Sequence, residues 1–120
     1  MENKEFAKLL EERTKRLAID IIRLSASLPD TPENRVIRYQ LSKSGTSIGA
    51  NYREANRSRS KADFKSKIRI CESEASETLY WLELIMEVHV NLKQRVSTTM
   101  KEVSEILAIL TSISRNLSSN

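Results

Sequence analysis

The residues of this chain that first suggest catalysis or metal binding are two neighbouring glutamates, the one histidine and the one cysteine. Glu74 and Glu77 are three positions apart, so on a helix they would lie on the same face. A carboxylate metal centre in a helical bundle needs Glu-x-x-His pairs from two helices, and His89 is the single histidine. Cys71 falls among apolar residues at helical spacing, where a small buried hydrophobe is expected. We therefore expect no enzyme active site, no metal site and no cofactor.

The two glutamates have a structural role in our interpretation. An unpaired charge on an apolar stripe is costly to bury. We expect Glu74 and Glu77 to form a buried polar network with groups such as Asn51 or Arg38, within one chain or across a subunit boundary. The stripe that carries them also contains Ile70, Trp81, Leu84 and Val88.

Basic residues cluster in the middle of the chain. The segment 35–69 contains ten Lys or Arg residues against two acidic ones. A solvated helix surface and a phosphate-binding patch are both consistent with this pattern. No aromatic-rich module or zinc finger accompanies it, so we expect any RNA to be recognised by shape and charge rather than by sequence. The candidate RNA-binding residues are Arg53, Arg57, Arg59, Lys61, Lys65 and Arg69.

A run of small residues precedes this basic cluster. Gly45 and Gly49 lie four positions apart, and a glycine inside a helix costs about 1 kcal/mol relative to alanine. Close approach of another helix is the usual compensation. Two interpretations remain open, tight packing inside one bundle or a docking surface for another subunit or a ligand. The residues concerned are Ser42, Gly45, Thr46, Gly49 and Asn51.

The elements that must position these residues are helical. Only two glycines and two prolines occur among 120 residues, and such scarce turn residues are typical of long helices with short connections. Apolar residues recur at steps of three and four along the chain, as on one face of a helix. The predicted helices span residues 5–27, 32–57, 61–88 and 92–117.

The predicted connections carry boundary signals. Pro29 ends the first helix, because the residue before a proline is disfavoured in the helical region. Thr31 before Pro32 fits an N-cap, and Ser60 with Asp63 resembles a capping box. Short connections force neighbouring long helices to be antiparallel. We predict one all-α domain, an antiparallel up-down-up-down four-helix bundle; the alternative is an extended hairpin that completes its core by oligomerising.

Composition indicates the compartment and the partners. The net charge is +4. No apolar stretch approaches the roughly 18 residues needed to span a membrane, and the chain does not start with a secretory signal pattern. A single cysteine suits a reducing compartment. We expect a cytoplasmic protein with no membrane or small-molecule partner.

Several motifs occur together in one order along the chain: Gln40-Leu-Ser-Lys-Ser-Gly-Thr-Ser-Ile-Gly-Ala-Asn51, Glu54-Ala55, Ser60-Lys-Ala-Asp-Phe64, Glu74-Ala-Ser-Glu-Thr78 and Tyr80-Trp-Leu-Glu-Leu84. Their order and spacing resemble those of a known family, the bacterial 23S rRNA intervening-sequence proteins. The resemblance covers about Phe6 to Leu117, with Lys43 and Tyr52 as departures in detail. It implies homopentamers of four-helix protomers, and RNA binding as the leading functional suggestion.

Two functions follow from these observations. The first is a non-catalytic oligomeric protein that binds structured RNA or a ribonucleoprotein through a basic surface. The second is an oligomeric scaffold or adaptor that binds another protein and never contacts nucleic acid. RNA binding that weakens steeply with salt would distinguish the first from the second, because neutralised phosphates release counterions.

Overall fold

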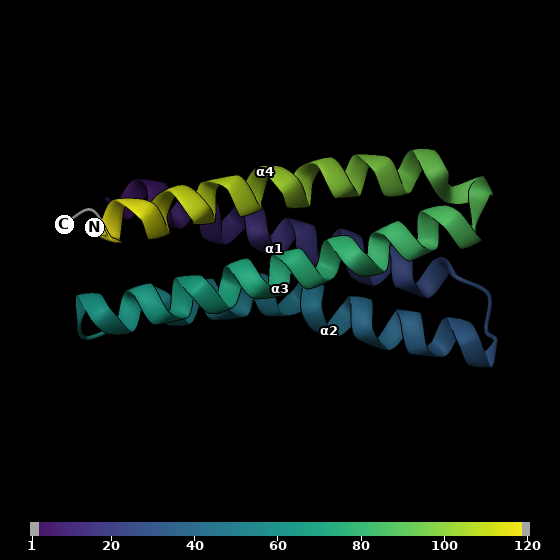
Figure 1. Ribbon diagram of the computed structural model, residues 1–120, viewed down its shortest axis with the longest axis horizontal. Coiled ribbons are helices and arrows are strands. Elements are labelled where there is room, and N and C mark those ends of the chain that lie inside the picture. The colour runs from purple at the N-terminus through teal and green to yellow at the C-terminus, as the bar shows by residue number, and fades with distance from the viewer. Residues whose placement is uncertain (1–2, 119–120) are drawn as a thin grey trace.

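The computed structural model describes residues 3–118 of the protein, and long α-helices make up most of that range (Figure 1). No strand occurs within this part of the chain. The prediction of an all-α four-helix bundle is confirmed. The helices are α1 Lys4–Ser27, α2 Pro32–Ala55, α3 Lys61–Val88 and α4 Lys93–Ser118, with a short 3-10 helix, η1 Val90–Leu92, before α4.

Helices that follow one another in sequence pack side by side. α2 contacts both α1 and α3, and α3 also contacts α4, whereas the contact between α1 and α4 is much sparser. The molecule is elongated, with extents of 46 × 22 × 21 Å. The start of α1, the α2–α3 connection and the end of α4 lie at one end of the bundle (Figure 1). The other two connections lie at the opposite end.

Local chemistry explains where the helices begin and end. Leu28 has extended backbone angles, φ −71° and ψ 141°, immediately before Pro29. The Thr31 side chain accepts a hydrogen bond from the backbone N–H of Asn34 at 3.1 Å. Ser60 caps α3 in the same way, at 3.1 Å from the backbone N–H three residues on. The end of α1 before Pro29 and the side-chain N-caps at Thr31 and Ser60 are therefore as predicted.

The end of α2 differs from the prediction. The helix was expected to reach Arg57 but ends at Ala55. The Arg57 N–H bonds to the carbonyl of Glu54, and the Ser58 N–H bonds to that of Ala55. These bonds span three residues rather than four, so the chain tightens into a 3-10-type turn before the connection. Arg57 therefore lies in the connection.

The core is formed by one apolar stripe from each helix. Leu17, Ile48, Leu82 and Ile106 represent the four helices in it, and none is more than 2% exposed. Cys71 is also fully buried in this core, as the sequence predicted. Burial raises the pKa of its thiol to about 12.

The two glycines of α2 bring this helix close to α1. A Cβ atom on Gly45 would lie 2.5 Å from Cδ1 and 2.8 Å from Cγ2 of Ile21. A Cβ atom on Gly49 would lie 3.0 Å from Oγ1 of Thr14. Non-bonded carbon atoms normally stay about 3.5–4.0 Å apart, so only a residue without a side chain fits at Gly45. The cost of glycine inside a helix is thus offset by packing within one chain.

The sparser contact between α1 and α4 is bridged by a charged cluster. Arg13 occupies a position on the apolar stripe of α1, and its Nε and Nη2 atoms each lie 2.7 Å from an oxygen of Glu102. Nη2 also lies 3.1 Å from Oε1 of Glu105. The hydrogen bond from Arg13 lowers the pKa of the Glu102 carboxyl below its ordinary value.

Candidate nucleic-acid interface

All six candidate RNA-binding residues lie toward the end of the bundle where α2 passes into α3. Arg57 and Arg59 belong to the connection, and Lys61 is the first residue of α3. These three side chains are exposed. Because the connection is short, they remain close to one another. We call the full set of six the basic band: Arg53, Arg57, Arg59, Lys61, Lys65 and Arg69.

Arg53 lies on the side of the basic band that faces α1. Its Nε atom is 3.8 Å from Oε1 of Glu11, and its side chain is 49% exposed. An exposed ion pair contributes little to stability. The guanidinium of Arg53 therefore remains available to a second anion.

Lys65 and Arg69 lie on a different side of the basic band. They are four residues apart on α3 and lie on the face that also carries Glu72. Glu72 contacts α4, since Oγ1 of Thr111 lies 3.4 Å from its Oε2 atom. The two basic residues are therefore directed toward α4. The six residues form a band around the end of the bundle rather than one flat patch.

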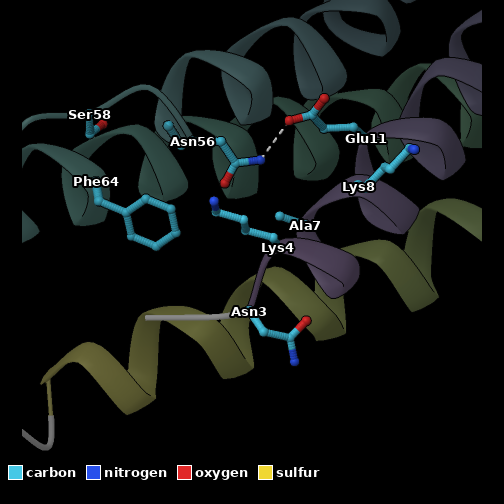
Figure 2. Close-up of a pocket in the computed structure, with 9 residues that line it drawn as sticks. Asn3, Lys4, Ala7, Lys8, Glu11, Asn56, Ser58 and Phe64 are labelled. Atoms are coloured by element: carbon cyan, nitrogen blue, oxygen red, sulfur yellow. Dashed lines mark hydrogen bonds between the residues drawn. The ribbon is translucent and has the colours of Figure 1, made fainter.

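Two further lysines lie at this end and were absent from the sequence prediction. α1 is antiparallel to α2, so the start of α1 lies beside the end of α2 (Figure 1). Lys4 and Lys8 are both exposed and line a pocket next to the α2–α3 connection (Figure 2). The antiparallel topology predicted from the short connections already implies this position. It places the start of the first helix, and therefore Lys4 and Lys8, beside the end of the second.

The residues of the small-residue run divide between two environments. Ser42 joins the α1–α2 contact, with its Oγ atom 3.1 Å from that of Ser25. Thr46 and Asn51 bond instead to the backbone of α2; the Asn51 amide donates to the carbonyl of Ser47 at 2.9 Å. Asn51 is therefore not a partner for the glutamates of α3 in this chain. Close packing within the bundle therefore involves Ser42, Gly45 and Gly49, which face α1.

The glutamate pair of α3 does not form the expected buried network within one chain. Glu77 is exposed and accepts a hydrogen bond from Nε1 of Trp81 at 3.0 Å. Glu74 is half-buried. Arg38, one of the expected partners, lies 3.6 Å from Asp30 instead. The reason is that the stripe carrying both glutamates faces outward; a network across a subunit boundary stays a prediction.

Large apolar side chains are exposed on the outside of both α2 and α3. Trp81 and Leu84 are half-buried there, and the ring of Tyr80 meets that of Trp81 edge-on at a centroid distance of 5.1 Å. We call this surface the outer apolar face. Its exposed apolar members are Val36, Tyr39, Ile70, Tyr80 and Val88.

The residues with potential for chemistry are dispersed. Within residues 3–118, no three His, Cys, Asp or Glu side chains are placed to hold a metal ion. His89 lies at the opposite end from the basic band, with Nε2 2.9 Å from Oδ1 of Asn34. The raised pKa of Cys71 keeps its thiol protonated at neutral pH, and the thiolate is the nucleophilic form. Across the same residues, every helix is too short or too polar to cross a bilayer.

Comparison with known proteins identifies the family. The family model described as 23S rRNA-intervening sequence protein matches residues 9–112. The chain is also similar to the crystal structure of a protein with unknown function from the S23 ribosomal protein family of Bacteroides thetaiotaomicron. The two are 34% identical with a TM-score of 0.81, over 91% of this chain and 97% of that one. No curated protein matches. The chain therefore belongs to the 23S rRNA-intervening sequence protein family, as its motifs predicted.

Proposed function

We propose that this protein is a non-catalytic cytoplasmic protein that binds structured RNA, alone or in a ribonucleoprotein, through the basic band. One observation carries the proposal: Arg57, Arg59 and Lys61 are exposed together at the α2–α3 connection. Among the described residues none of the three forms an ion pair, whereas Arg13, Arg35 and other basic residues elsewhere do. Unpaired, exposed cations are the groups that neutralise phosphates.

The curvature of the basic band suits a folded RNA. Its cations come from the end of α2, from the connection and from the first turns of α3, so they can reach phosphates of more than one strand. Contacts to phosphates position RNA without reading its sequence. Each phosphate neutralised should make the slope of log affinity against log salt more negative, by about 0.7–0.9 on the scale of other nucleic acids.

We also propose that the protein self-associates, as a homopentamer, through the outer apolar face. Tyr39, Tyr80 and Val88 are 63%, 53% and 63% exposed, and large apolar surfaces of this kind mark interaction sites. The resemblance to the family supports the number of five. A ring would repeat the basic band in every subunit and strengthen the field around a bound RNA.

Fluorescence anisotropy with a labelled ribosomal RNA stem-loop, at two salt concentrations, tests RNA binding. The test variant carries Arg57→Glu, Arg59→Glu and Lys61→Glu. The control variant carries Arg23→Glu, Lys93→Glu and Lys101→Glu, three exposed positions away from the band with the same change in net charge. We expect the test variant to lose binding and the control to keep it.

Two results would contradict the proposal. The absence of binding even at low salt would remove RNA from the function. Equal loss in both variants would show that net charge, rather than the basic band, attracts the RNA. Circular dichroism of each variant checks that the bundle remains folded.

The second candidate function is an oligomeric scaffold or adaptor. The outer apolar face favours it, because Tyr39, Tyr80 and Val88 are exposed there and could pack against a partner protein. Light scattering on the purified protein decides whether the face is used between copies. A monomeric mass would contradict self-association. The outer apolar face would then be expected to bind a different protein.

A further inference from the structure

The pocket beside the basic band is the feature that the proposed function leaves unused. It has a volume of about 460 Å³ and lies between the start of α1 and the α2–α3 connection (Figure 2). Sites for small organic ligands typically measure about 300–1,000 Å³. The pocket is therefore large enough for one flat heterocyclic ring with its substituents.

Part of the pocket is apolar. Ala7 of α1, Ala55 at the end of α2 and Phe64 of α3 contribute to its lining. Ala55 and Phe64 are 1% and 3% exposed, so they belong to the rigid core of the bundle. Two small side chains leave the space open, and the packed helices keep its walls in place.

Two polar side chains on the α2–α3 side have hydrogen-bonding capacity left over. The Asn56 amide nitrogen donates to Oε2 of Glu11 at 2.9 Å, which leaves the Asn56 carbonyl oxygen as an acceptor. The Oγ atom of Ser58 is buried and has no hydrogen-bond partner. A buried hydroxyl without a partner is unfavourable, so a ligand atom that bonds to it would be stabilised there. Ser58 is itself one of the residues that line the pocket.

Positive charge lines the α1 side of the same pocket. Lys4 reaches from α1 toward the space between Asn56 and Phe64, and Lys8 follows one turn later (Figure 2). Neither lysine forms an ion pair with another described residue. Arg57 flanks Asn56 in the chain and is exposed. An acceptor, a hydroxyl and an apolar wall thus lie next to several free cations.

We propose that this pocket binds one unpaired nucleotide, with the base inside the pocket and its phosphate at the lysines. The inference rests on the proposed RNA binding and deepens it. Asparagine and serine can hydrogen-bond the edge of a base that has left its helix, as in other proteins that recognise unpaired RNA. The basic band would hold the adjoining helix by its phosphates, so an RNA with a bulged nucleotide is the expected ligand.

The test compares two RNA hairpins that differ by one bulged 2-aminopurine nucleotide. Ala7→Leu fills the pocket without touching the basic band, and Ala26→Leu makes the same change at an exposed position near the other end of α1. We expect the unmodified protein to bind the bulged hairpin about tenfold more tightly than the paired one. Ala7→Leu should abolish this preference and leave the paired hairpin bound as before, whereas Ala26→Leu should change neither.

The possible results separate the inference from the proposed function. Equal affinity for both hairpins, or a preference that survives Ala7→Leu, would overturn the pocket while RNA binding stands. If neither hairpin binds, RNA binding is overturned. Binding of adenosine monophosphate then tests the pocket by itself. Changes in the amide NMR signals of Asn56 and Ser58 on adding adenosine monophosphate, but not on adding inorganic phosphate, would show that the pocket binds a free nucleotide. The absence of such shifts would overturn it.

Discussion

The hydroxyl groups of Ser44 on α2 and Thr78 on α3 are hydrogen-bonded to each other at 3.0 Å inside the core. They are 1% and 0% exposed. Each also reaches a carbonyl of its own helix, Glu74 at 2.7 Å from Thr78 and Leu41 at 3.3 Å from Ser44. A polar contact thus replaces an apolar one at the most extensive helix–helix interface of the bundle.

This pair should behave as a unit when it is mutated. We expect Ser44→Ala and Thr78→Val each to lower the free energy of unfolding by about 1 kcal/mol. The double variant should lose less than the sum, because each single variant already removes the bond between the two hydroxyls. Urea unfolding at one fixed protein concentration measures this, since self-association would link stability to concentration. Strictly additive losses would show that the two hydroxyls act independently.

The glycine contact predicts an asymmetry between two similar substitutions. Gly45→Ala places a methyl group 2.5 Å from Ile21, whose side chain is fully buried. Overpacking of a core typically costs about 1–3 kcal/mol, which exceeds the gain of about 1 kcal/mol in helix propensity. Gly49→Ala meets its nearest atom at 3.0 Å and should cost less. Thermal unfolding of both variants checks this order, and a stabilised Gly45→Ala protein would contradict it.

The Arg13–Glu102 pair predicts a dependence of stability on pH. The pKa of Glu102 is lowered in the folded state, chiefly by its hydrogen bond to Arg13. Its contribution is therefore present above the unfolded-state pKa near 4.5 and is lost as the pH falls through the lower folded value.

The corresponding experiment uses Glu102→Gln. Both partners are about one-third exposed, so we expect a loss of only about 0.5–1 kcal/mol at pH 7. The difference from the unmodified protein should shrink as the pH falls below about 4.5. Glu12→Gln, at an exposed position of α1, is the control. A difference that stays constant with pH would contradict the assignment.

Cys71 provides a probe of the core. The pKa of its thiol is about 12, and the side chain is fully buried. We expect no reaction with Ellman's reagent at pH 8 in the folded protein, and complete reaction in urea. The chain has no other cysteine, so the signal belongs to this residue alone. Rapid labelling under native conditions would contradict the packing around it.

The sequence was sufficient to predict the helices because their boundary signals act locally. Pro29, Thr31 and Ser60 each determine a boundary through the residues next to them. The end of α2 lacked such a signal, and the predicted helix was two residues too long. Short-range chemistry therefore accounts for most of the fold.

The parts of the site that were missed depend on contacts between distant segments. Lys4 and Lys8 join the basic end only because α1 runs antiparallel to α2. Glu77 was predicted to be buried because it shares a stripe with Trp81, but that stripe faces outward in the single chain. Helical periodicity shows which residues share a face, and it does not show which of two faces is covered.

The order in which the helices pack also bears on how fast the bundle forms. Each helix lies mainly against its neighbour in sequence, and the connections are short, so little chain entropy is lost as each pair forms. Helical proteins with such local contacts fold in microseconds to milliseconds. Only the α1–α4 contact joins segments from opposite ends of the chain. We expect this contact to form last and to separate first, with the rate of unfolding governed by Arg13 and its two glutamates.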